Sequence, residues 1–270
     1  LQGVGAALLT ATAPAALTAA FTSEAQRKRA FGYLGSSGGI GLALGALLAG
    51  AASEWGGWRL AYALPIPLAL AALWVCMTSR EALARRRVST TVPWTALLHN
   101  RSFVISCVIC LLFTTVWVAL FIYAPLHMQS IDALDPRAVG MTMLALLLPA
   151  LVMPIVATRL VLVLPARAVL LAGFFVIALG LWLMDVAWSG STSRVYELAG
   201  LALAGTGAGM LYGLVDYLGL TAVLPEQAGL ASGAFNVVRL LGDILAAIIP
   251  GAVVLNAVTA AFARAQANVP

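Results

Sequence analysis

The chain contains 270 residues, of which 62% are hydrophobic and 9% are charged, and its mean hydropathy is +1.01. This number of charged side chains is too small to form the surface of a water-soluble globular protein of this size. The composition therefore excludes that class and predicts a polytopic membrane protein. The net charge of +5 resides in short segments between apolar runs, without aromatic residues interleaved among the basic ones, and therefore indicates no nucleic-acid partner.

Eight apolar runs follow one another along the chain, and each is long enough to cross a hydrocarbon core about 30 Å thick. The predicted spans cover residues 1–20, 31–52, 59–78, 102–126, 138–160, 166–188, 195–223 and 229–255. The sequence therefore predicts an all-α membrane protein. Because the first run starts at Leu1 in mid-helix, without an initiator methionine, we also expect the chain to be a fragment.

The basic residues predict the orientation of the chain in the membrane. If the first span ends on the cytoplasmic side, ten of the fifteen Lys and Arg residues lie in cytoplasmic segments. The opposite topology would reverse this asymmetry and violate the positive-inside rule. We therefore expect the polar segment 80–101 to be cytoplasmic.

The second run, Phe31 to Gly50, is rich in glycine. At 100° per residue its small residues form two adjacent stripes, one with Gly38, Gly41 and Gly45 and the other with Gly32, Gly35, Gly39 and Gly50. Hydrocarbon enforces a helix even here, because no other local conformation satisfies the backbone hydrogen bonds. The glycines are therefore predicted to let neighbouring helices approach closely, either as generic packing residues or as part of a motif.

Four of these glycines have a spacing that resembles the antiporter signature of the major facilitator superfamily, G(x8)G(x3)GP(x2)GG. Gly32, Gly41, Gly45 and Gly50 match it, whereas Ala46 stands where the signature has proline. The stretches Leu1–Ala7 and Glu226–Gly233 are similar to the fourth helix and to the junction of the tenth and eleventh helices of the same family. The resemblance is to the drug:proton antiporter, or multidrug exporter, branch.

The resemblance implies a major facilitator type helical bundle with two parallel six-helix halves, incomplete in this chain. A shift of 202 residues places Leu1, Gly3 and Gly5 on Leu203, Gly205 and Gly207, as expected for equivalent helices of two halves. On this basis residues 1–79 form the C-terminal part of the first half, about helices 4–6. Residues 80–101 form a cytoplasmic linker, and residues 102–270 form the second half, about helices 7–11, without the last helix.

Three charged residues, Asp216, Arg239 and Asp243, fall inside predicted spans, where an unpaired ion costs at least about 2.5 kcal/mol. Arg239 and Asp243 share a polar stripe of the last span with Ser232 and Asn236, and we expect this stripe to face a protein or water-filled interior. Because they are four residues apart, Arg239 and Asp243 are candidates for a structural pair within the helix. Asp216 or Asp243 is alternatively a carrier of protons, with Arg239 in a charge relay.

The function implied by the resemblance is proton-coupled export of a lipophilic drug or secondary metabolite across the cell membrane by alternating access. Two alternatives stay open: a proton-coupled metabolite importer, and a non-transporting sensor, scaffold or truncated remnant. The sequence has no constellation of catalytic residues, P-loop or metal-ligand spacing, so we expect no enzyme activity and no cofactor besides the proton gradient. The expected partners are a small lipophilic substrate, protons and membrane lipids, and the sequence does not indicate an oligomeric state.

Overall fold

The structure, a computed structural model, describes residues 2–21, 23–78, 95–189, 194–224 and 227–267. All regular elements within these ranges are helices, as the composition predicts. They are α1 (Gln2–Ala20), α2 (Glu24–Ala63), α3 (Pro65–Thr78), α5 (Thr95–His99), α6 (Arg101–Ser130), α7 (Pro136–Val163), α8 (Ala166–Ser189), α9 (Arg194–Leu211), α10 (Leu214–Thr221) and α11 (Ala228–Ala267).

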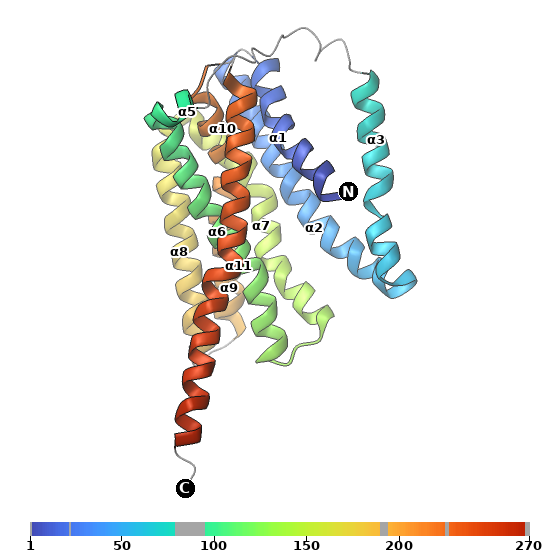
Figure 1. Cartoon of the computed structure of the whole chain (residues 1–270), viewed down its shortest axis with the longest axis vertical. Helices are drawn as coiled ribbons and strands as arrows, with labels where there is room; N and C mark the ends of the chain where they lie inside the picture. The colour runs from blue at the N-terminus through green and yellow to red at the C-terminus, as the bar shows by residue number, and fades with distance from the viewer. Residues whose placement is uncertain (1, 22, 79–94, 190–193, 225–226, 268–270) are drawn as a thin grey trace.

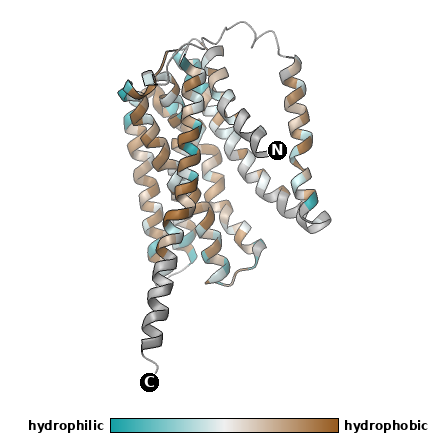
Figure 2. Ribbon diagram, in the orientation of Figure 1, coloured by the Kyte–Doolittle hydropathy of each residue, from teal (hydrophilic) through white to brown (hydrophobic). Residues whose placement is uncertain are grey.

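Five helical stretches within the described residues are long and apolar enough to cross a membrane. They are Arg101–Ser130, Arg137–Val163, Ala166–Ser189, Arg194–Thr221 and Ala228–Val253, which correspond to the last five predicted spans. The first three predicted spans are also helical, and α3 contributes a shorter apolar helix, Pro65–Val75. Figure 2 shows hydrophobic residues along the helices and hydrophilic ones gathered mainly near helix ends, the distribution that a bilayer requires.

Two glycines with positive φ set the positions where the helical path breaks. Gly57, with φ of 69°, divides α2, and the chain reverses direction close to the point where α2 and α3 meet in Figure 1. Gly213, with φ of 77°, interrupts the predicted span 195–223 and separates α9 from α10. Because residues with a side chain rarely adopt such a φ, glycine is needed at both breaks. The predicted span 195–223 is confirmed as the apolar stretch Arg194–Thr221, and Gly213 breaks the helix within it.

Local capping defines the starts of two of the long helices. The Asn100 side chain accepts a hydrogen bond from the Phe103 amide at the start of α6, at 3.2 Å. Asp135 accepts one from the Ala138 amide at 3.1 Å at the start of α7, and Pro136 occupies the first turn of that helix. Both capping residues satisfy amides that the helix itself leaves unpaired, and proline lacks one of them.

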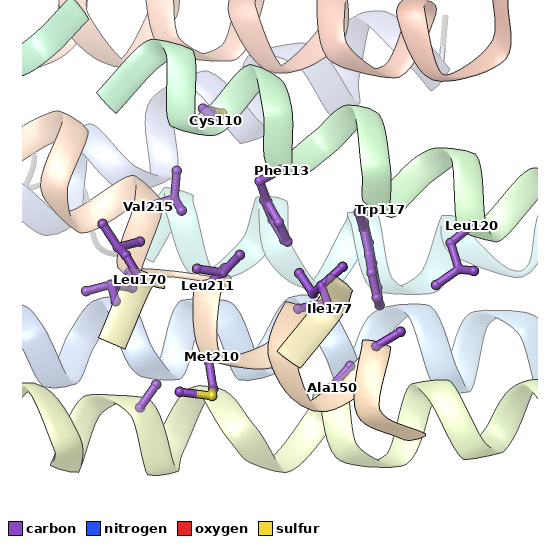
Figure 3. Packing of buried hydrophobic residues seen from close by; sticks show 14 of the residues in the cluster. Cys110, Phe113, Trp117, Leu120, Ala150, Leu170, Ile177, Met210, Leu211 and Val215 are labelled. Carbon is purple, nitrogen blue, oxygen red and sulfur yellow. The ribbon is translucent and has the colours of Figure 1, made fainter. Parts of the chain in front are cut away.

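The core of the molecule lies between α6, α7, α8, α9 and α10. Figure 3 shows Cys110, Phe113, Trp117 and Leu120 along α6, opposite Leu211, Ile177 and Met210. α9 packs against both α7 and α8, α6 packs against α11, and α2 packs against α7. Figure 1 places α1–α3 on one side of the α6–α11 group, with α5, α10, the end of α1 and the start of α2 at the same end of the bundle.

Small residues allow the closest helix crossings in this core. A Cβ at Gly180 of α8 would lie 2.6 Å from the backbone of Gly200 and Ala204 of α9, and one at Gly200 would lie 2.8 Å from Gly180. Gly173 and Gly207 make the corresponding approach one heptad away. Where lipid supplies no hydrophobic force between helices, such contacts maximise van der Waals packing. The sequence prediction concentrated on residues 31–50 and missed this seam, although its seven-residue spacing is visible in the sequence.

Candidate transport site

An ion pair between two helices is at the centre of the candidate site. The Arg239 guanidinium of α11 donates a hydrogen bond to Oδ1 of Asp216 in α10. The Asp216 side chain is 9% exposed and that of Arg239 is 27% exposed. Each charge therefore compensates the other in a region where either one alone would be costly.

This pairing corrects the hypothesis that Arg239 and Asp243 neutralise each other within their helix. Among the described residues, the carboxylate within 4.0 Å of Arg239 belongs to Asp216, not to Asp243. Asp216 is also buried inside the bundle rather than extended toward the membrane surface. Helical spacing made the Asp243 partner visible in the sequence, whereas the Asp216 partner depends on how α10 packs beside α11.

Asp243 is left as the carboxylate without an ion pair in this part of the described chain. It is half-buried and lies four residues from Arg239 in the same helix. Asp216, Arg239 and Asp243 together carry a net charge of −1 when all three are ionised. Because Arg239 and Asp216 neutralise each other, the remaining negative charge is that of the Asp243 carboxylate.

The three charged residues face a cavity of about 310 Å³ with an aromatic wall. Phe113, Trp117 and Phe121 of α6 and Tyr212 of the α9–α10 break contribute the rings. The Trp117 and Phe121 ring centroids are 4.8 Å apart, and those of Phe113 and Tyr212 are 5.8 Å apart, both in edge-to-face geometry. Figure 3 shows Phe113 and Trp117 pointing from α6 toward the side that carries Leu211 and Ile177. The cavity thus combines aromatic faces with one uncompensated carboxylate.

Two further tyrosines, one in α6 and one in α10, lie outside the lining of this cavity. The Tyr123 hydroxyl donates to the Ala247 carbonyl at 2.8 Å and thereby joins α6 to α11. Tyr217 lies at the other face of α10, with its ring centroid 6.0 Å from that of Phe31 in α2. The structure thus separates the aromatic residues of the cavity from those that join helices.

The polar stripe of α11 continues from the cavity toward α1. Ser232 is buried, and together with Asn236 and Arg239 it lines a narrow space against Thr10 and Pro14. The stripe therefore lies between α11, α10 and α1, with Asp243 at its cavity end.

The glycines of α2 divide into two groups by their surroundings. A Cβ at Gly32 would collide with Thr158 of α7, and one at Gly35 would lie 2.9 Å from the Tyr212 carbonyl oxygen. Gly41 and Gly45 have no atom of the described residues within 4 Å of a Cβ position. The surroundings of Gly50 lie outside the described residues. The packing role of the antiporter-like motif therefore stays a prediction at Gly41, Gly45 and Gly50.

A polar contact between α2 and α10 was missed by the sequence prediction. Glu24 forms a salt bridge with Lys28 at 2.8 Å and accepts a hydrogen bond from the Tyr217 hydroxyl at 3.3 Å. The Lys28 ammonium lies 5.9 Å from the centroid of the Tyr217 ring. The Lys28 hydrogen bond and charge, followed by the Tyr217 hydrogen bond, hold the pKa of the Glu24 carboxyl below its usual range. We call Glu24, Lys28 and Tyr217 the α2–α10 latch.

A bundle of long apolar helices around a charged, aromatic cavity defines this molecule as a polytopic membrane protein with a polar site in its interior. Comparison with known sequences identifies the family. The chain belongs to the Major Facilitator Superfamily, which matches residues 1–247.

Curated relatives within this family carry names that refer to multidrug resistance, puromycin resistance or actinorhodin transport. Multidrug resistance protein Stp of Mycobacterium tuberculosis is 26% identical, over 98% of this chain and 58% of Stp. Puromycin resistance protein pur8 of Streptomyces alboniger is 38% identical over 36% of the chain and 20% of pur8. The probable actinorhodin transporter of Streptomyces coelicolor is 28% identical over 76% of the chain and 35% of that protein. The chain thus spans less than two thirds of the length of these relatives.

Proposed function

We propose that the chain is part of a proton-coupled exporter that moves a lipophilic drug or secondary metabolite out across the cytoplasmic membrane. The observation that carries this proposal is the half-buried Asp243 carboxylate, which faces an aromatic cavity and forms no ion pair with any described residue. The names of Stp, pur8 and the actinorhodin transporter support the substrate class. Residues 1–79 and 102–270 would form parts of two halves that alternate access to the cavity.

In this mechanism Asp243 is the group that gains and loses a proton. Because Arg239 is already neutralised by Asp216, protonation of Asp243 changes the net charge of the three residues from −1 to 0. A carboxylate changes its affinity for protons when its exposure to water changes, so alternating access can load it on one side and unload it on the other. The same change alters how well the cavity attracts a substrate.

The test is Asp243→Asn in the protein expressed from its complete reading frame. We expect proton-driven efflux to fall about tenfold or more, while exchange of substrate across the membrane without a pH gradient persists. Asp185→Asn is the matched control, because Asp185 is an exposed carboxylate of α8 outside the cavity. Efflux by Asp243→Asn at the wild-type rate, with an unchanged dependence on the pH gradient, would contradict the proposed role of Asp243.

Transport direction separates the exporter from the two alternatives. In proteoliposomes with an imposed pH gradient, an exporter moves substrate against the direction of proton flow, whereas a symporting importer moves it along with the protons. A sensor or scaffold would bind the substrate without flux. We expect substrate and protons to cross the membrane in opposite directions.

A further inference from the structure

A second hollow lies between the start of α2 and the end of α7, and different residues line it from those of the aromatic cavity. Its volume is about 280 Å³. Arg29 and Tyr33 of α2 and Arg159 and Leu162 of α7 line it, and the close contact of Gly32 with Thr158 lies beneath them. The described residues that line it contribute two guanidinium groups and no carboxylate.

The two basic residues that precede Arg29 in the sequence already have interaction partners. Arg27 donates from Nε and Nη2 to the Phe21 carbonyl at 3.3 and 3.2 Å, and so binds the end of α1. Lys28 is paired with Glu24 in the α2–α10 latch. Arg29, by contrast, is exposed, and within the described chain no carboxylate lies within 4.0 Å of it.

Arg159 is in the same situation on the opposite wall of the hollow. It is exposed in the last turns of α7, and the ion pairs formed by described residues do not include it. Two guanidinium groups on facing helices, neither of them in an ion pair with a described residue, create a site for an anion. A phosphate group matches their planar donor geometry, because each guanidinium can donate two parallel hydrogen bonds to its oxygens.

An apolar hollow adjoins this basic one and shares two of its residues. It has a volume of about 500 Å³ and lies between α1 and α2, lined by Leu17, Phe21 and Leu34 as well as by Arg29 and Tyr33. A ligand held by Arg29 can therefore continue from a charged site into an apolar one. This combination fits an amphipathic anion with a hydrocarbon chain rather than a small ion.

We propose that Arg29 and Arg159 bind the phosphodiester of an anionic phospholipid, with an acyl chain in the apolar hollow between α1 and α2. Both arginines lie at the end of the bundle that the basic residues predict to be cytoplasmic. Basic pockets between helices on that side of a membrane are suited to lipid headgroups. The lipid would bridge α2 and α7, which belong to the two proposed halves.

The test is native mass spectrometry of the detergent-solubilised protein, expressed from its complete reading frame, with phosphatidylglycerol and phosphatidylcholine in competition. We expect one phosphatidylglycerol to be retained in preference to phosphatidylcholine. The double variant Arg29→Gln/Arg159→Gln should reduce this preference by about 30-fold, the combined effect of two arginines at an anionic surface. Arg167→Gln, an exposed arginine at the same end outside both hollows, is the control that should retain it.

Three results would overturn the proposal. Equal retention of the two lipids by the wild type would remove the preference for an anionic headgroup, and wild-type retention by the double variant would remove the two arginines as its cause. Displacement of the lipid by inorganic phosphate at equal concentration would show a simple phosphate site without a role for the acyl chain. Thermal unfolding of each variant checks that it is folded, and if the double variant is not, Arg159→Gln alone is judged by the same criteria.

Discussion

Arg239 shows how a charge is accommodated inside this bundle. Its guanidinium binds Asp216 across the α10–α11 contact, and the narrow space beside the pair is bordered by Pro14, Phe235 and Asn236. Removing one partner from a buried pair leaves an uncompensated charge, which costs more than removing both. The pair is therefore expected to behave as a unit in mutational experiments.

We expect Asp216→Asn to lower the free energy of unfolding by about 3 kcal/mol, because Arg239 loses its counter-charge. The double variant Asp216→Asn/Arg239→Gln should recover most of this loss, since it replaces the ions by two neutral amides. Thermal unfolding in detergent, followed by tryptophan fluorescence, measures the three proteins as a double-mutant cycle with the wild type. Arg167→Gln serves as the reference, because Arg167 is exposed and forms no ion pair with a described residue. Additive losses in the cycle would contradict the coupling.

At the scale of helices, α2 depends on glycine at the points where it meets α7 and the α9–α10 break. The contact at Gly35 is with backbone atoms, namely the Tyr212 carbonyl oxygen at 2.9 Å and its carbon at 3.0 Å from a Cβ position. Backbone atoms cannot turn aside as a flexible side chain can. A larger residue at position 35 must therefore push α2 away from the α9–α10 break.

We expect Gly35→Leu to abolish efflux while membrane insertion is retained, with a cost of about 1–3 kcal/mol from overpacking. Gly140→Leu is the matched control, because the same substitution in α7 has no described atom within 4 Å of its Cβ. Efflux assays on cells with equal amounts of membrane-inserted protein compare the two variants. Wild-type efflux from Gly35→Leu would show that the close approach of α2 to the α9–α10 break is dispensable.

The sequence predicts elements better than it predicts contacts between them. Hydropathy locates the spans because the bilayer requires long apolar helices, but it does not report φ, so the break at Gly213 was missed. The interior charges were found because charge is costly in hydrocarbon. The Arg239–Asp216 pair and the Glu24–Tyr217 hydrogen bond join residues 23 and 193 positions apart, and such partners follow from packing rather than from helical periodicity.

At the scale of the whole molecule, the end predicted to be cytoplasmic is closed along α2 and α10. The α2–α10 latch lies there, beside the edge-to-face contact of Phe31 with Tyr217. A Cβ at Gly213 would collide with the Phe31 carbonyl oxygen, so the two backbones touch at this point. If residues 1–79 and 102–270 move as halves during transport, this contact must open in the state that admits substrate from the cytoplasm.

We expect Tyr217→Phe to increase the population of molecules open at this end, because it removes the hydrogen bond to Glu24 and keeps the ring that packs on Phe31. Spin labels at the exposed positions Gln26 and Leu224 report the opening as a shift toward longer distances. Tyr196→Phe, at an exposed tyrosine of α9, should leave the distribution unchanged.

Acidification provides an independent check on the same latch. Because Lys28 and Tyr217 lower the pKa of Glu24, the carboxylate and its stabilising contacts are present above the usual Glu pKa and are lost only as the pH falls through the lower value in the folded protein. The wild-type distance distribution should therefore be the same at pH 7 and at about pH 5.5. Opening between these two values would mean that a group other than Glu24 controls this end of the molecule.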